Sequence, residues 1–292
     1  MSDTVRSGLV VVDKAGGLTS HDVVARMRRI AGTRKVGHAG TLDPMATGVL
    51  LVGINRATRL LGHLALTEKS YDATVRLGMA TTTDDAEGEP LSRTPAGHLT
   101  EDDVISASHA FVGSISQRPS AVSAIKVDGR RAYARVRAGE DVELPARPVT
   151  VHHLVVSEVR TDGDAVDVDV SLRCSSGTYV RALARDLGTA LGVGGHLTRL
   201  RRTSVGPFAL DEAHTLEQLA DVLAIGDLAE VARRCFPVHH VDAARARDVG
   251  FGRAFEAGLR ADGPVAVFDP QGGFLALYEQ RGDAAVPVAV FV

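Results

Sequence analysis

Apolar and polar residues alternate over several short stretches of the chain, which is the pattern of half-buried β-strands. The clearest case is AVDVDVSLRC, residues 165–174, where Val166 and Val168 face one side and Asp167 and Asp169 face the other. Further strands are predicted, from alternation or from short apolar runs, at residues 8–14, 49–53, 69–79, 149–159 and 197–205. Because one face of each alternating strand is apolar, we expect the strands to form a sheet over a core.

Helices are predicted between these strands from capping residues and from apolar residues at helical spacing. Thr19 or Ser20 can cap a helix that ends at Gly32. Three further helices are predicted, one capped by Asn55 and running to Leu61, one opened by a Thr100–Asp103 capping box and running to Phe111, and one over residues 175–192. In the last helix the spacing of the leucines predicts that Tyr179 lies on the apolar face.

The pattern changes near Pro237, which divides the chain into two predicted domains. Residues 1–238 are predicted to form an α+β domain around a mixed, largely antiparallel sheet. Residues 239–292 are predicted to form a small β-rich domain, because two apolar runs in residues 263–279 flank a hairpin turn. Residues 113–147 have weak periodicity, so we expect an exposed excursion from the larger domain.

The composition favours a globular protein of the cytoplasm. Of the 292 residues 45% are hydrophobic, but no apolar run approaches the roughly 20 residues that span a bilayer. Met1 to Ser7 form a segment too short and polar for a signal peptide. Cys174 and Cys235 are too few for a disulfide framework or a four-thiolate metal site, so we expect two reduced thiols.

Charge is unevenly distributed along the chain, although the net charge is only −3. Residues 118–147 contain seven Lys or Arg and four acidic residues, and residues 173–202 contain six Arg and one acidic residue. Residues 84–103 contain seven acidic residues and one Arg. Such blocks are either a basic face, suited to a polyanion, on an acidic protein or ordinary solvated charge, and charge alone does not decide between them.

A single carboxylate stands out in GHAGTLDPMATGVLLVG, residues 37–53. Asp43 precedes Pro44, which favours extended backbone, and the four glycines of the segment allow tight turns and close approach of a ligand. Such an acid either caps a turn or acts chemically without a second carboxylate beside it. Glycosidases usually need two carboxylates at a set separation, so this chemistry is not favoured.

Other chemistries lack their usual residues in this chain. There is no Gly-x-Ser-x-Gly elbow for a nucleophilic serine and no phosphate-binding glycine loop. The pairs His152–His153 and His239–His240 would point to opposite faces of a strand, which makes each a poor metal chelate. Asp84, Asp85 and Glu87 lack calcium-loop spacing, so we expect a solvated loop there. The residues therefore indicate a reaction without a metal or a cofactor.

Five segments, in order along the chain, resemble those of one enzyme family. They are LVVVDKAGGLTSHDVV (9–24), GHAGTLDPMATGVLLVG (37–53), KSYDATVRLG (69–78), SAIKVDGRRAYARVRAG (123–139) and CSSGTYVRALARDLG (174–188). Over roughly residues 8–210 the chain resembles the bacterial tRNA pseudouridine-55 synthases of the TruB type. It departs from the family pattern at Lys14-Ala15, usually Lys-Pro, and at Pro119-Ser120 and Val122, usually Pro-Pro and then an aromatic residue.

The resemblance implies a pseudouridine-synthase-like catalytic domain, a PUA-like C-terminal RNA-binding domain, and the isomerisation of one uridine at position 55 in the T loop of tRNA. The base would be cut from C1′ at N1, turned and rejoined through C5, without a cofactor. Residues 113–147 would be an insertion that closes over the T stem-loop. The implied partner is tRNA, without a membrane or an obligate protein partner, and the implied state is a monomer.

The resemblance also implies roles for single residues. Asp43 matches the essential aspartate, Arg181 matches the arginine that pairs with it, and Tyr71 matches the tyrosine that stacks on the target base. Among the further substrate-binding matches, Tyr179 and Leu200 match pocket residues, and His38 matches the histidine that fills the space left by the flipped nucleotide. The implied RNA contacts in the insertion are Lys126, Arg130 and Arg131. Two rivals stay open: a non-catalytic RNA-binding or RNA-folding protein, and a synthase of the same fold acting on another RNA.

Overall fold

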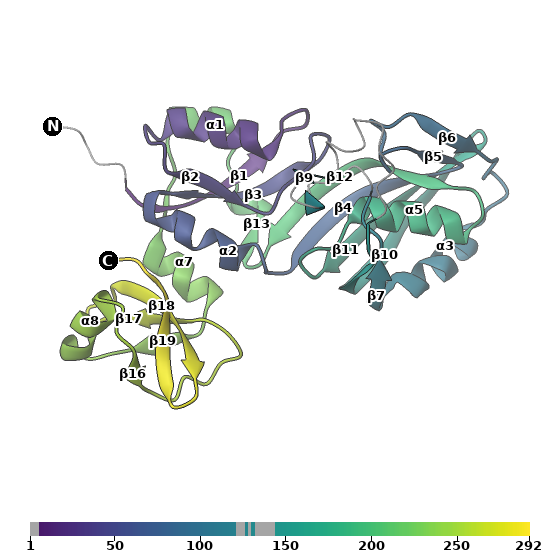
Figure 1. Cartoon of the computed structure of the whole chain (residues 1–292). Coiled ribbons are helices and arrows are strands. Elements are labelled where there is room, and N and C mark those ends of the chain that lie inside the picture. Colours follow the sequence, from purple (N-terminus) through teal and green to yellow (C-terminus); the bar gives the residue numbers. More distant parts are fainter. Residues whose placement is uncertain (1–5, 121–125, 128–129, 132–143) are drawn as a thin grey trace.

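Two β-sheets organise the chain (Figure 1). The computed structural model describes residues 6–120 and 144–292, and the backbone alone at residues 126–127 and 130–131. The large sheet has ten strands and extends across the upper part of Figure 1, while a five-stranded sheet lies below it near the C-terminus. Helices pack on both, which confirms the predicted α+β class.

Eight strands form the continuous path of the large sheet. Their order is β14 (Gly226–Asp227), β1 (Gly8–Lys14), β3 (Thr47–Ile54), β12 (Gly195–Val205), β4 (Lys69–Leu77), β11 (Ala165–Cys174), β10 (Arg147–Asp162) and β7 (Gly113–Gln117). Beside this path, β2 (Val36–Ala39) pairs with β3 and β13 (Phe208–Ala209) pairs with β12. The described pairings are antiparallel except that between β12 and β3, so the predicted mixed, largely antiparallel sheet is confirmed.

Short ribbons and helices complete the larger part of the fold. The ribbons are β5 (Met79–Thr81) with β6 (Pro90–Arg93) and β8 (Lys126–Val127) with β9 (Arg130–Arg131). The helices are α1 (Ser20–Ile30), α2 (Leu61–Leu64), α3 (Glu101–Ser108), α5 (Val180–Ala190), α6 (Leu216–Asp221) and α7 (Leu228–Cys235), with 3₁₀ turns η1 (Asn55–Arg59), η2 (His109–Phe111) and η3 (Leu210–Glu212). α1 and α3 begin with capping boxes, Thr19 with Asp22 and the predicted Thr100 with Asp103, which satisfy free N–H groups at their first turns.

Two local predictions are wrong. Asn55 does not cap a helix: it is the first residue of η1, has a φ of 54°, and its side chain accepts a hydrogen bond from Thr33. Residues 175–179 form a loop before α5, which makes Tyr179 the cap residue and not part of a helix face. The first residues of the predicted excursion 113–147 form β7, an edge strand that pairs with β10, and the excursion as a whole stays a prediction.

The parallel junction between β3 and β12 depends on Gly48, which has a φ of 98° and faces Arg202. A Cβ atom on Gly48 would lie 2.2 Å from the carbonyl oxygen of Arg202. Gly48→Ala is therefore expected to lower the free energy of unfolding in urea by roughly 2–5 kcal/mol, through backbone strain and separation of the strands. Gly17→Ala is the control, because Gly17 has a φ of 79° but open space around a Cβ. Equal losses in both variants would contradict the close approach.

The C-terminal sheet contains the predicted hairpin, formed by β17 and β18. Its strand order is β15 (Val238–His240), β17 (Val265–Phe268), β18 (Phe274–Arg281), β19 (Ala284–Val290) and β16 (Phe255–Glu256), with α8 (Ala243–Gly250) beside it. Phe268, Phe274 and Phe291 share one apolar cluster with Leu60 and Leu64, so the sheet packs on the larger part of the chain near α2 and α7 (Figure 1). No helix in the described part of the chain combines the length and the apolar character needed to cross a bilayer.

Candidate active site

A cavity of about 370 Å³ opens beside the junction of β3, β12 and β4. It is enclosed by the loop between β2 and β3, the start of β4, the middle of β12 and the loop before α5. Five of the residues predicted for the site line it: Asp43, Tyr71, Tyr179, Arg181 and Leu200. Segments that are far apart in sequence therefore meet at one place, as the resemblance implies.

Asp43 and Arg181 form an ion pair at this cavity. The distance from Arg181 Nε to Asp43 Oδ2 is 2.9 Å, and the side chains are 5% and 38% exposed. On its other side, Arg181 Nη1 lies 3.3 Å from Asp85 Oδ2 and donates to the carbonyl oxygen of Thr83 at 2.8 Å. A buried guanidinium thus lies between two carboxylates, and only Asp43 of these two lines the cavity.

Buried polar side chains bind the backbone of the loop that carries Asp43. The Ser20 hydroxyl accepts from the backbone N–H of Leu42 at 2.9 Å and donates to the carbonyl oxygen of the same residue at 3.2 Å. Lys14 is fully buried, and its Nζ donates to the carbonyl oxygen of Pro44 at 3.2 Å. These contacts hold the backbone on both sides of the carboxylate, so Asp43 is presented from a preorganised loop.

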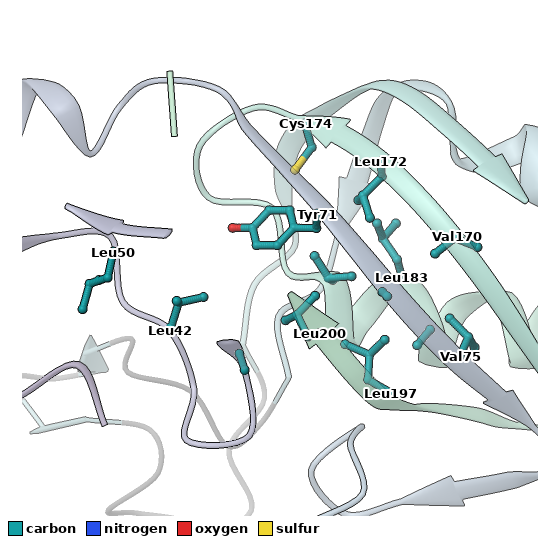
Figure 2. Close-up of a cluster of buried hydrophobic side chains, with 14 of the residues drawn as sticks. Leu42, Leu50, Tyr71, Val75, Val170, Leu172, Cys174, Leu183, Leu197 and Leu200 are labelled. Carbon is teal, nitrogen blue, oxygen red and sulfur yellow. The ribbon is translucent and has the colours of Figure 1, made fainter. Parts of the chain in front are cut away.

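Tyr71 lies on β4 at the wall of the cavity and is 7% exposed. In Figure 2 its ring belongs to the apolar cluster that also contains Leu172, and its hydroxyl is directed away from Cys174. Burial raises the pKa of Tyr71, and the neighbouring Arg202 guanidinium opposes that rise. The ring is therefore a neutral aromatic surface at neutral pH, beside a cation.

Tyr179 and Leu200 complete the apolar wall. Tyr179 caps α5, and its backbone is bound by the buried Gln117 side chain, which accepts from the Tyr179 N–H at 2.7 Å and donates to its carbonyl oxygen at 3.0 Å. Gln117 ends β7, where the predicted insertion begins, so this amide joins the insertion to the cavity. Leu200 comes from β12 and is 6% exposed.

The acidic loop after β5 is not solvated as predicted. Asp84 and Asp85 are only 9% and 3% exposed, because each is paired with an arginine of α5. Asp84 also accepts a hydrogen bond from Ser120, and its backbone has a φ of 59°. Burial raises the pKa of Asp84, against the effect of these partners. The sequence carries no signal for this burial, since the partners lie about a hundred positions away; Thr83 and Arg181, for example, are 98 apart.

His38 does not line the cavity. It lies on β2, its ring packs edge-on against His21 with centroids 5.5 Å apart, and its Nδ1 is buried without a hydrogen-bond partner among the described residues. Burial, helped by the charges of His21 and Arg202, lowers the pKa of His38 to about 4. The predicted role of His38 in occupying the space of a flipped nucleotide thus stays a prediction.

Acid should destabilise the fold through His38. Between pH 6.5 and 4 the unfolded chain binds a proton at His38 that the folded chain excludes, so the free energy of unfolding falls on acidification by up to about 3 kcal/mol. His38→Phe keeps a ring but cannot titrate, and urea unfolding at pH 7 and pH 4.5 should show a smaller acid loss for the variant. Equal acid losses in both proteins would contradict the low pKa.

The predicted RNA contacts and the expected lack of a metal site concern residues that the structure describes only in part. Lys126, Arg130 and Arg131 lie on the β8–β9 ribbon, but their side chains fall outside the described residues, so RNA contact stays a prediction. Within the described ranges no three His, Cys, Asp or Glu side chains are grouped as ligands of a metal ion. The cavity itself is lined by the carboxylate of Asp43 with its arginine, by the rings of Tyr71 and Tyr179, and by two further cations, Lys69 and Arg202.

Comparison with protein families accounts for nearly the whole chain in three consecutive pieces. Residues 28–180 match the TruB family pseudouridylate synthase N-terminal domain. Residues 181–237 match the tRNA pseudouridylate synthase B C-terminal domain, and residues 236–292 match the C-terminal domain of tRNA pseudouridine synthase II. The first match contains Asp43 and Tyr71 and ends one residue before Arg181.

Similar proteins and structures agree with the family match. The chain is 57% identical to tRNA pseudouridine synthase B of Arthrobacter sp. (strain FB24), over 98% of this chain and 96% of the relative. It is 58% identical to the protein of the same name of Thermobifida fusca, over 97% and 98%. Among solved structures, a Cbf5-Nop10-Gar1 complex matches with a TM-score of 0.75 at 29% identity, over 98% of this chain and 85% of that chain. Domain matches that together cover residues 28–292, with relatives of near-full length, establish that the chain belongs to the TruB family of pseudouridylate synthases.

Proposed function

We propose that the protein isomerises the uridine at position 55 in the T loop of tRNA to pseudouridine. The observation that carries the proposal is the Asp43–Arg181 ion pair, which faces a cavity with aromatic walls. Relatives at 57% and 58% identity are tRNA pseudouridine synthases B, which supports tRNA as the substrate. A docking surface for RNA would not need a carboxylate held in this way, so the enzyme is favoured over a non-catalytic RNA-binding protein.

The reaction needs one carboxylate at the sugar. The C1′–N1 bond breaks, the base turns, a C1′–C5 bond forms, C5 loses its proton and N1 gains one, so no water or cofactor is consumed. Asp43 acts either as the nucleophile at C1′ or as the base that removes the C2′ proton. In both routes Arg181 orients the carboxylate through their ion pair.

The aromatic walls suit a flipped nucleotide. Taking a base out of its stack costs a few kcal/mol, roughly, and stacking on an aromatic ring returns about 1–3 kcal/mol per base. Tyr71 offers its ring for this contact, Tyr179 and Leu200 enclose the base, and the Tyr71 hydroxyl is a candidate to take the C5 proton after rejoining. His38, nearer to α1, is proposed to fill the position vacated in the RNA.

The division of labour along the chain is proposed as follows. Residues 1–238 are the catalytic domain, and residues 239–292 are a PUA-like RNA-binding domain. The insertion of residues 113–147, with Lys126, Arg130 and Arg131, contacts phosphates of the T stem-loop and gives salt-dependent affinity. The protein is proposed to act in the cytoplasm, as a monomer and without an obligate protein partner.

The test is pseudouridine mapping at single-nucleotide resolution on an unmodified tRNA transcript. The wild-type protein, with a chelator and no added metal, should produce pseudouridine at position 55 only, and none in a transcript with cytidine at that position. Modification at a different uridine would overturn the T-loop assignment. Tight, salt-sensitive binding without any pseudouridine would instead favour the non-catalytic alternative.

A further inference from the structure

Two buried cations line the cavity besides Arg181. Lys69 on β4 is 7% exposed and Arg202 on β12 is 1% exposed, and both border the cavity. Neither forms a salt bridge with any carboxylate in the described part of the chain, whereas Arg181 has Asp43 and Asp85. Burying a charge without a counter-ion is costly, so two such charges at one cavity call for an anionic partner there.

Backbone carbonyl groups hold both cations in place. Lys69 Nζ donates to the carbonyl oxygens of Ala65 at 2.8 Å and Thr67 at 2.7 Å, which leaves one of its three N–H groups. Arg202 donates from Nε, Nη2 and Nη1 to three carbonyl oxygens, those of Val49 at 2.7 Å, Gly40 at 2.9 Å and Thr41 at 3.4 Å. Two of its five N–H groups take no part in these three bonds, and the Tyr71 hydroxyl lies within reach of the guanidinium. These bonds orient the cations but do not cancel their charges.

The two cations flank the ring proposed to stack on the base. Lys69 and Tyr71 are two positions apart on β4, so their side chains leave the same face of the sheet. Arg202 is directly opposite Tyr71 in the register of β12 and β4. Gly40 lies between the cations: a Cβ built on it would be 3.4 Å from Lys69 Cε and 3.6 Å from Arg202 Nη1. Burial and Arg202 lower the pKa of Lys69 to about 8, so the ammonium form still predominates at neutral pH.

The reaction itself produces an anion at this position. When the C1′–N1 bond breaks, its electron pair leaves with the base, whether Asp43 attacks C1′ or removes the C2′ proton. The uracil stays negatively charged until C5 uses a pair of electrons to form the new bond. Fixed cations in a desolvated site stabilise such charge far more than water would, because they need no reorganisation.

We infer that Lys69 and Arg202 stabilise the uracil anion between breakage of the old glycosidic bond and formation of the new one. The inference rests on the proposed function and extends it to the leaving group, which Asp43 and Arg181 do not serve. A backbone phosphate of the RNA is the other anion that the pair could meet. A phosphate contact would change RNA binding, whereas an anion formed during reaction changes the rate.

The test compares uridine with 5-fluorouridine at position 55 of tRNA, in single-turnover consumption of the nucleoside followed by mass spectrometry. Fluorine withdraws electron density and stabilises the uracil anion. Cleavage of the C1′–N1 bond of 5-fluorouridine therefore depends less on stabilisation of the anion by the protein. Lys69→Met should slow uridine consumption by about 10²-fold and 5-fluorouridine consumption by about tenfold or less. Lys69→Arg, which keeps the charge, should restore the wild-type ratio of the two rates.

Lys14→Met is the matched control. Lys14 is also a buried lysine that donates to three carbonyl oxygens, but it does not line the cavity. Its loss should slow both substrates by the same factor. Equal slowing of both substrates by Lys69→Met, or weaker tRNA binding with an unchanged rate, would overturn the inference. Lys69→Gln repeats the test if the methionine variant fails to fold. A wild-type protein that consumes neither substrate would overturn the proposed function itself, which distinguishes that failure from failure of the inference.

Discussion

Asp43→Asn is expected to abolish pseudouridine formation, with a loss of at least about 10⁴-fold in the single-turnover rate. An amide can neither attack C1′ nor remove the C2′ proton, and the Leu42 and Pro44 backbone contacts that shape the loop do not involve the side chain of Asp43. The affinity for tRNA should therefore stay within a few-fold of wild type. The pseudouridine content of digested tRNA, measured by mass spectrometry, gives the rate.

Asp13→Asn is the matched control for Asp43→Asn. Asp13 is also a carboxylate paired with an arginine, at 2.7 Å from Arg201 Nη2, but it does not line the cavity. We expect this variant to keep most of the wild-type rate. Similar losses in the two variants would mean that the charge of the surroundings matters and not the chemistry of Asp43.

Arg181→Met should slow the reaction by roughly 10²–10³-fold. The variant removes the cation between Asp43 and Asp85 and leaves those two carboxylates facing a desolvated space. Asp43 then loses the contact that orients its carboxylate toward the cavity. Single-turnover rates of the variant and of wild type on the same tRNA provide the measurement.

Arg185→Met separates the role of Arg181 from that of a carboxylate-paired arginine of the same helix in general. Arg185 is one turn later on α5 and pairs with Asp84 and Asp186, away from the cavity lining. Its loss should loosen the acidic loop and cost much less activity than the loss of Arg181. An equal effect would contradict the assignment of Arg181 to the reaction.

The site exists because two parts of the large sheet join through a short parallel contact between β3 and β12. Arg202, at this contact, reaches back to the carbonyl oxygens of Gly40 and Thr41 in the loop that carries Asp43. The same strand supplies Leu200 to the cavity wall. Fold and site therefore share residues, and a change at the junction is expected to affect both.

Much of the fold could be predicted from the chain alone where local pattern decides the outcome. The alternating residues 165–174 form β11 as predicted, because one face meets the core and the other meets polar neighbours. The capping box at Thr100 opens α3, and the glycine-rich turn in residues 263–279 joins β17 to β18. In these cases the determinants of the element lie within it.

Sequence-based predictions are wrong where residues far away in the chain decide whether a side chain is buried or where a helix begins. Asp84 and Asp85 carry the composition of a solvated loop, and only α5, about a hundred positions later, buries them. The leucine spacing predicts Tyr179 on the apolar face of a helix. Tyr179 is instead the cap residue of α5, and the Gln117 side chain binds both of its backbone groups. Likewise, nothing local distinguishes Lys69 on its strand from a surface lysine.

The candidate site was predicted through the resemblance more than through local pattern. From local pattern Asp43 either caps a turn or acts chemically, whereas the resemblance brings in Tyr71 and Arg181, and the three residues meet at one cavity in the folded chain. His38 lies beside His21 and outside the cavity lining, and its role in filling the space left by a flipped nucleotide stays a prediction.

The most direct test of the central claim, that Asp43 performs glycosyl exchange without a metal, is tritium release from tRNA labelled at uridine C5. Wild type and Asp43→Asn are compared in the presence of a chelator, with tRNA binding measured in parallel. The account predicts one tritium released per tRNA by wild type, none by the variant, and similar binding by both. Release by the variant, or no release by a wild type that binds tRNA tightly, would contradict it.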